Sequence, residues 1–161
     1  MRRIETVAEQ WREHIIRPTL LKLGLWSLSA ERLLLGTAVQ ESGLQYVVQL
    51  GGGPALGAWQ MERRTHDDIW DNYLEYRPGL RDAVLQFLAP WPPQESREIA
   101  LVTNAAYCCA MARVHYYRVP QRLPDSDDLP ALARYWKEHY NTAEGAGTTL
   151  QFMRAAHRAG V

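Results

Sequence analysis

Apolar residues recur every three or four positions along most of this chain, which is the period of an amphipathic α-helix. The stretches between them are rich in Ser, Thr, Gly and Pro, the residues that begin or end helices. The pattern predicts helices over residues 4–16, 19–26, 27–41, 65–76, 78–88, 95–117, 130–140 and from 148 onward. The predicted fold is therefore mainly α.

Local signals mark several of the helix boundaries. Capping side chains start helices, glycine in the left-handed conformation ends them, and proline interrupts them unless it lies in the first turn. The signals in this chain are a break at Pro18, an N-cap at Ser27 or Ser29, an end at Gly43, a capping box at Thr65, a first turn at Pro78 and a capping box at Thr148.

Two stretches stand out along the chain. Residues 44–50 are rich in β-branched and aromatic residues, so a short strand or hairpin arm is predicted there, with a glycine-rich turn at residues 51–54. Residues 95–117 form the longest uninterrupted helical stretch, and their many small side chains predict a central buried helix. A stiff proline-rich connector at residues 89–93 precedes it.

Composition supports a single globular domain over residues 1–161. Hydrophobic residues make up 47% and charged residues 22%, which excludes a disordered chain. The formal net charge is zero, so we expect no nucleic-acid partner, and the basic and aromatic residues 113–118 are interpreted as one surface face. The abundant Trp and Tyr are first of all core residues, although sugar clefts use the same rings.

Cysteine and histidine placement excludes several chemistries. Cys108 and Cys109 are adjacent in a helical stretch and are interpreted as reduced core residues. No zinc spacing exists, so neither a metal nor another cofactor is expected. No secretion-signal core or membrane span is present, and we expect a monomer that is synthesised in the cytoplasm.

Glu41 is the first candidate for chemistry. It ends an apolar helix, where burial can raise the pKa of a carboxyl from about 4.3 toward the value of about 6 that suits a general acid. The alternative is an ordinary exposed glutamate in a last helical turn, and position alone favours that alternative. A carboxylate there is also unfavourable to the helix dipole, which suggests that it is kept for another reason.

Two further clusters carry polar groups next to turns. In residues 57–60 a glycine allows close backbone approach and Gln60 offers an amide donor and acceptor. The alternative is a plain turn before a helix. In residues 135–141 the side chains of Tyr140 and Asn141 could line a cleft, whereas Tyr135 and Trp136 are more typical of a core face.

The order of these motifs resembles the soluble lytic transglycosylase and goose-type lysozyme family. The matching parts are Glu41-Ser42, the Gly-x-x-Gln at residues 57–60, the small-residue helix at 104–112 and the Tyr-Asn pair at 140–141. The similarity covers residues 33–145. Gly-Ala-Trp-Gln stands where the family usually has Gly-Leu-Met-Gln, and the Tyr motif can also be aligned onto Tyr135. The resemblance implies a lysozyme-like domain with a short β or loop segment after the catalytic helix.

The resemblance also implies an activity and site residues. The activity is cleavage of the β-1,4 bond between N-acetylmuramic acid and N-acetylglucosamine in peptidoglycan, with Glu41 as general acid and base. Ser42 and Gln60 would hold N-acetyl or peptide groups, and Tyr140 and Asn141 would lie near Glu41. A lytic transglycosylase needs only this one carboxylate, whereas a hydrolytic lysozyme would use a second one or a positioned water. The candidates for the second carboxylate are Glu62, Asp67 and Asp68.

Two other functional classes compete with the enzyme. The first is a phage or secretion component that keeps the lysozyme-like fold to bind glycan or a partner without cleaving it. The second is a helical regulatory module with no role in glycan binding. An enzyme of this kind would reach the cell wall after delivery by a phage, a holin or a secretion system.

Overall fold

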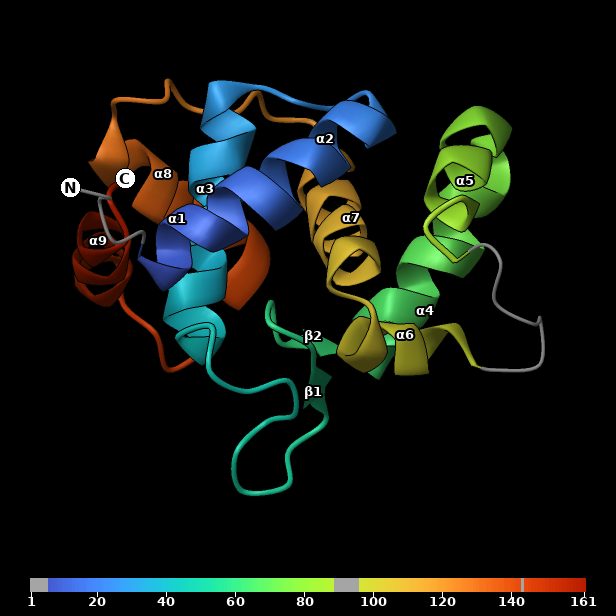
Figure 1. Cartoon of the computed structure of the whole chain (residues 1–161), viewed down its shortest axis with the longest axis horizontal. Coiled ribbons are helices and arrows are strands. Elements are labelled where there is room, and N and C mark those ends of the chain that lie inside the picture. The colour runs from blue at the N-terminus through green and yellow to red at the C-terminus, as the bar shows by residue number, and fades with distance from the viewer. Residues whose placement is uncertain (1–5, 89–95, 143) are drawn as a thin grey trace, which may run out of the picture.

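Helices make up most of the computed structural model, which describes residues 6–88, 96–142 and 144–161. Helix accounts for 65% of the described residues, which also contain two short strands, so the mainly α prediction is confirmed. Figure 1 shows the elements. Their bounds are α1 Val7–Trp11, η1 Arg12–Ile16, α2 Arg17–Leu23, α3 Leu28–Ser42, β1 Ala55–Leu56, β2 Met61–Glu62, α4 Arg63–Asn72, η2 Leu74–Tyr76, α5 Pro78–Leu85, α6 Arg97–Thr103, α7 Ala105–Tyr117, α8 Leu129–Trp136, η3 Lys137–Asn141 and α9 Thr149–Arg158.

The N-terminal helix continues through Pro18, so the predicted break there is wrong. Elements α1, η1 and α2 follow one another without a gap, and η1 is π-helical. Proline has no N–H to donate to the turn before it, and a π-helical segment is a common way to accommodate such a defect. The helix ends at Gly24, which has a positive φ of 75°.

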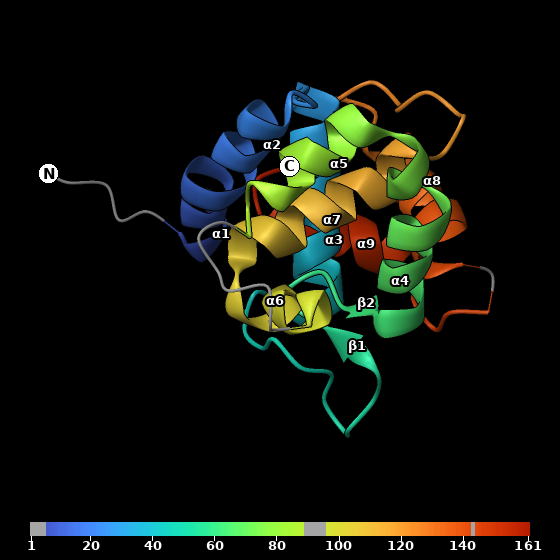
Figure 2. The same cartoon turned by 90° about the vertical axis from the view of Figure 1, so that its right-hand side faces the viewer.

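Helix α3 follows the predicted boundaries and is largely buried. The Ser27 hydroxyl caps its first turn by accepting from the Ala30 N–H at 3.0 Å, and Gly43 ends it with a φ of 61°. The helix packs against α9 at Gly36, where an added Cβ would lie 2.6 Å from Phe152 Cζ. Helices α7, α8 and α9 surround α3 (Figures 1 and 2).

The segment after α3 is where the β structure lies, but not at the predicted residues. Residues 44–50 form no strand, and only Val48 makes a single bridge, to Leu56. The antiparallel pair is β1 with β2, which joins Leu56 to Met61. Val47 is exposed, and the pairing of this stretch with β1 stops at that bridge and the two backbone hydrogen bonds beside it, so β propensity alone does not produce a strand. The predicted glycine turn is confirmed, with φ near 80° at Gly51 and Gly52.

Helix α4 begins two residues earlier than its predicted cap. Glu62 is the N-cap and makes no side-chain cap bond, while Thr65 lies inside the first turn. The chain enters the helix directly from β2, so the strand pairing, and not the capping box, sets this boundary.

The predicted helix over residues 95–117 is two helices. Asn104 separates α6 from α7 because its side chain accepts from the Tyr107 N–H at 2.9 Å and donates to the Phe87 carbonyl at 2.8 Å. Helix α7 is the central buried helix that was predicted, and Cys108 and Cys109 are buried free thiols. The proposed connector at residues 89–93 lies outside the described residues.

The C-terminal helices complete the core. Asp128 caps α8, and Thr148 with Gln151 forms the predicted capping box of α9. The predicted helix to residue 140 is present, although its last turn is the π-helical η3. Nearly all of the buried apolar residues form one contiguous cluster. Within the described parts of the chain, no helix is both long and apolar enough to cross a membrane.

Candidate active site

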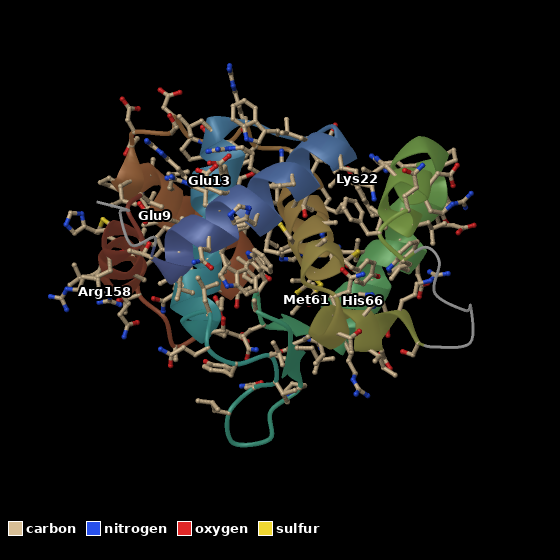
Figure 3. The ribbon with its side chains drawn as sticks, in the orientation of Figure 1. Glu9, Glu13, Lys22, Met61, His66 and Arg158 are labelled. Atoms are coloured by element: carbon tan, nitrogen blue, oxygen red, sulfur yellow. The ribbon has the colours of Figure 1, made fainter. Side chains whose placement is uncertain are left out.

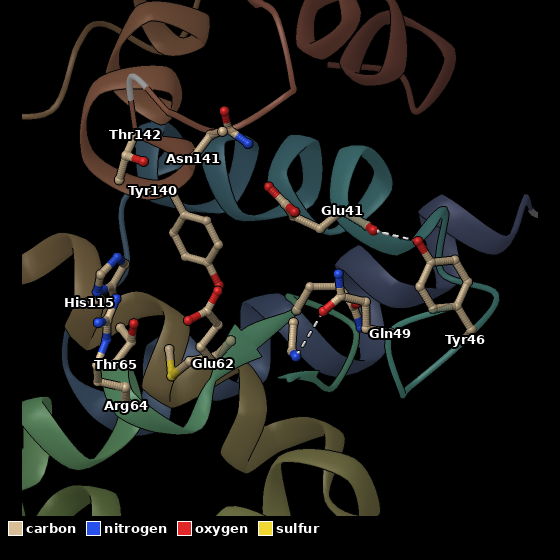
Figure 4. A pocket seen from close by; sticks show the side chains of 14 residues that line it. Glu41, Tyr46, Gln49, Glu62, Arg64, Thr65, His115, Tyr140, Asn141 and Thr142 are labelled. Carbon is tan, nitrogen blue, oxygen red and sulfur yellow. Dashed lines mark hydrogen bonds between the residues drawn. The ribbon is translucent and has the colours of Figure 1, made fainter. Parts of the chain in front are cut away.

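A cavity of about 450 Å³ lies where α3, the β hairpin, α7 and η3 meet. Five of the predicted site residues line it, namely Glu41, Gln60, Glu62, Tyr140 and Asn141. Figure 4 shows Glu41 and Tyr140 entering the cavity from one side and Glu62 from the other. The cavity therefore gathers side chains that are up to a hundred positions apart in the sequence.

Glu41 is half-buried in the last turn of α3 and has no cation beside it. Within the part of the chain that the structure describes, its carboxylate forms no ion pair, and its one side-chain partner is the Trp136 indole, whose Nε1 donates to Oε1 at 3.0 Å. Burial raises the pKa of Glu41 from 4.5 to about 7, and the Trp136 hydrogen bond opposes that rise. Glu41 is thus poised to hold or release a proton near neutral pH.

Ser42 lies behind the cavity and does not line it. Its side chain is 2% exposed, and the hydroxyl donates to the Ala58 carbonyl at 2.7 Å. It also accepts from the Leu44 N–H at 3.2 Å. The structure thus gives Ser42 an anchoring role between the end of α3 and the turn at residues 57–60, rather than the predicted contact with substrate.

The turn at residues 57–60 is held tightly, which fixes Gln60 in the cavity wall. Gln60 has a φ of 48°, and its amide donates to the Gly57 carbonyl at 2.8 Å. A non-glycine residue in this region costs of the order of 1–3 kcal/mol and is kept only where its surroundings enforce it. The enforcement comes from Trp59, which is fully buried and donates to the Leu34 carbonyl at 2.9 Å.

Tyr140 joins η3 to the same turn. Its hydroxyl donates to the Trp59 carbonyl at 2.7 Å. Burial, and then the nearby Glu41 charge, holds the pKa of Tyr140 well above its ordinary value. The phenol therefore stays protonated and serves as a rigid wall beside the carboxyl group.

Asn141 lines the cavity and also takes part in hydrogen bonds that fix the loop after η3. Lys137 Nζ donates to Asn141 Oδ1 at 2.7 Å and to the Gly145 carbonyl at 2.8 Å. The next residue, Thr142, also lines the cavity and has a positive φ of 68°. Two of the cavity residues, Gln60 and Thr142, therefore have backbone conformations that are unusual for their residue types.

His115 is a cavity residue that sequence reasoning did not single out. Its ring packs edge-on against Tyr140 with centroids 4.9 Å apart. Its Nδ1 accepts from Arg118 at 3.2 Å, and burial lowers the pKa of His115 to about 4. The ring is therefore neutral at neutral pH. Trp136 and Tyr46 were also missed; Tyr46 Oη donates to the Glu41 backbone carbonyl at 2.8 Å. No sequence signal pairs Trp136 with Glu41 or His115 with Tyr140, because these contacts join distant parts of the chain.

The three candidates for a second carboxylate differ in whether they line the cavity. Glu62 lines the cavity. Asp67 lies beside His66, with 3.0 Å between Oδ1 and Nδ1, and Asp68 forms an ion pair with Arg118 at 2.6 Å. Neither aspartate lines the cavity, so both are removed as candidates for chemistry beside Glu41.

The chain matches no family model, no characterised protein and no solved structure in the three comparisons. Across residues 6–88, 96–142 and 144–161, no group of three or more His, Cys, Asp or Glu side chains is placed to hold a metal ion.

Proposed function

We propose that this protein cleaves the β-1,4 glycosidic bond between N-acetylmuramic acid and N-acetylglucosamine in peptidoglycan, with a lysozyme-like fold and Glu41 as its general acid and base. The observation that carries this proposal is the Glu41 carboxyl, which has a pKa of about 7 at the wall of an open cavity. General acid catalysis needs a protonated group near the working pH. The order of Glu41, Gln60 and Tyr140 in the sequence, and their meeting in one cavity, supports the family resemblance.

The proposed reaction needs one carboxyl group. Protonated Glu41 gives its proton to the glycosidic oxygen as the bond from that oxygen to C1 breaks, and the acetamido oxygen of the substrate bonds to C1. The Glu41 carboxylate then takes the proton of the substrate 6-hydroxyl, whose oxygen attacks C1 and displaces the acetamido oxygen. The products are a free 4-hydroxyl and a 1,6-anhydro end, and Glu41 is protonated again.

Glu62 is the residue on which a hydrolytic route would depend. It is exposed and reaches the cavity from β2, on the side facing Glu41 (Figure 4). In an inverting hydrolase a second carboxylate activates a water on the far face of the sugar. We propose the single-carboxylate route because its chemistry then depends only on Glu41, whose buried carboxyl lines the cavity.

The proposal is tested with purified peptidoglycan sacculi and the Glu41→Gln protein. Removing a general acid costs roughly 10² to 10⁴-fold in rate, so clearing of the sacculi should be almost lost. Glu75→Gln removes an exposed glutamate outside the cavity and should clear sacculi like the wild type. Clearing by Glu41→Gln at the wild-type rate would rule out the assigned role.

A further inference from the structure

A second cavity, of about 660 Å³, is lined mainly by arginine and tyrosine side chains. Arg77, Arg113, Arg118 and Arg122 all line it. None of the described residues in its lining is acidic. It adjoins the candidate active site through the bond between Arg118 and His115, but it contains none of the residues to which the proposed cleavage assigns chemistry.

Arg113 is the least expected of these residues. It lies in the middle of the buried helix α7, and its side chain is 7% exposed. Nε donates to the Leu25 carbonyl at 3.1 Å, and no ion pair with a described carboxylate compensates the charge. Burial lowers the pKa of Arg113. Burying a charge without a counter-charge destabilises the folded state. An arginine at this position is therefore unfavourable unless it binds an anion.

The terminal nitrogens of Arg113 keep access to the cavity. They have no hydrogen-bond partner among the described residues, whereas every fully buried side-chain nitrogen or oxygen in that part of the chain has one. The donors that remain open on Arg113 are therefore not sealed inside the core. They belong to the planar fork with which guanidinium binds carboxylate or phosphate.

Aromatic rings hold two of the guanidinium groups in place. Arg113 Cζ lies 5.4 Å from the centroid of the Tyr117 ring, and Arg77 Cζ lies 4.0 Å from that of Tyr73. A guanidinium that packs its face on a ring keeps its N–H edge free for hydrogen bonding. Arg118 is neutralised by Asp68 at 2.6 Å. Arg77, Arg113 and Arg122 have no carboxylate partner among the described residues and supply the remaining positive charge.

We propose that this arginine-lined cavity is a binding site for an oxyanion with at least two negative charges, a phosphate group or a compact dicarboxylate. Arg113 would bind it at the base of the cavity, and Arg77 and Arg122 would bind it from the rim. If Arg113 served only to tie α7 to Leu25, its single backbone hydrogen bond would not require the three other arginines or the open donors.

The test is calorimetric titration of the full-length protein with inorganic phosphate and, separately, with malonate, at constant ionic strength. We expect saturable binding of one anion per chain, and the tighter of the two identifies the oxyanion class. Arg113→Gln should weaken binding by about tenfold or more, because a charge-assisted pair is lost. Arg122→Gln changes an exposed side chain and should weaken binding several-fold without affecting folding.

Arg158→Gln is the matched control, because it removes the same charge from α9, at the opposite end of the molecule from α5 (Figures 1 and 3). It should leave the affinity unchanged, as should Glu41→Gln, which separates this site from the proposed cleavage. The proposal is overturned if neither anion binds saturably, or if both Arg113→Gln and Arg122→Gln bind like the wild type.

Discussion

Glu31 and Glu41 belong to the same helix, but their neighbours give them different chemistry. Glu31 is fully buried and is paired with Arg17 at 2.7 Å, with a further hydrogen bond from Trp26. Glu41 is half-buried and has only the neutral Trp136 donor. The ion pair between Glu31 and Arg17 holds α2 to α3, whereas burial without a cationic partner raises the pKa of Glu41. Residue type is shared, but Glu31 lies in the first turn of α3 and Glu41 in its last turn, and only Glu31 has a cationic partner.

Trp136→Phe should raise the pKa of Glu41 further. Phenylalanine keeps most of the packing of the ring on Phe152, which has a centroid 5.2 Å away, but removes the donor that stabilises the carboxylate. Loss of a hydrogen bond to a charged group should shift the pKa upward by up to about one unit. The alkaline limb of the pH–rate profile, expected near pH 7 in the wild type, should move up. An unchanged limb would mean that Trp136 does not tune Glu41.

Glu41→Gln should stabilise the fold at alkaline pH. The pKa of Glu41 is about 7 in the folded protein against an ordinary 4.5, so stability falls as pH rises between these values. This loss is at most about 3 kcal/mol, and glutamine avoids it. Urea unfolding at pH 8 should find the variant more stable than the wild type, and the difference should vanish near pH 4. A variant that is equally stable or less stable at pH 8 would contradict the burial of an unpaired carboxyl.

At the scale of elements, boundaries set by local chemistry were predictable and those set by distant contacts were not. Ser27, Gly43 and the Thr148 capping box act within their own turns, and the structure has all three. The break at Asn104 was missed because its side chain is fixed partly by the Phe87 carbonyl. Likewise, the hairpin forms where Leu56 meets Met61 rather than where β propensity is highest.

Gly57→Ala should disrupt the turn that carries Gln60. Gly57 has a φ of 76°, and an added Cβ would lie 2.3 Å from Cys108 Sγ and 2.4 Å from the Leu101 carbonyl oxygen. Strain and overpacking together should cost about 2 kcal/mol or more of unfolding free energy. Gly79→Ala is the control, because nothing lies within 4 Å of its Cβ position, and it should stabilise helix α5 by about 0.4–1 kcal/mol. If urea unfolding gave the same change in unfolding free energy for both variants, the close packing at Gly57 would be contradicted.

At the scale of the whole molecule, the order of the motifs in the sequence predicted several of the residues that line the cavity, but not all of them. Glu41, Gln60, Tyr140 and Asn141 were predicted together and line one cavity. His115 joins them from α7, and Ser42 turns inward instead. A sequence motif shows which side chains are present, but the tertiary packing of α3, α7 and η3 determines which of them face the cavity.

The most direct test of the central claim is mass spectrometry of the muropeptides that the protein releases from purified sacculi. The account predicts fragments with 1,6-anhydro ends from the wild type, and none from a folded Glu41→Gln protein. Fragments with reducing ends would indicate hydrolysis instead of the single-carboxylate route, and Glu62 would then be the candidate for the second carboxylate. Intact sacculi after wild-type treatment, or the same fragments from Glu41→Gln, would contradict Glu41 as the acid of a peptidoglycan-cleaving enzyme.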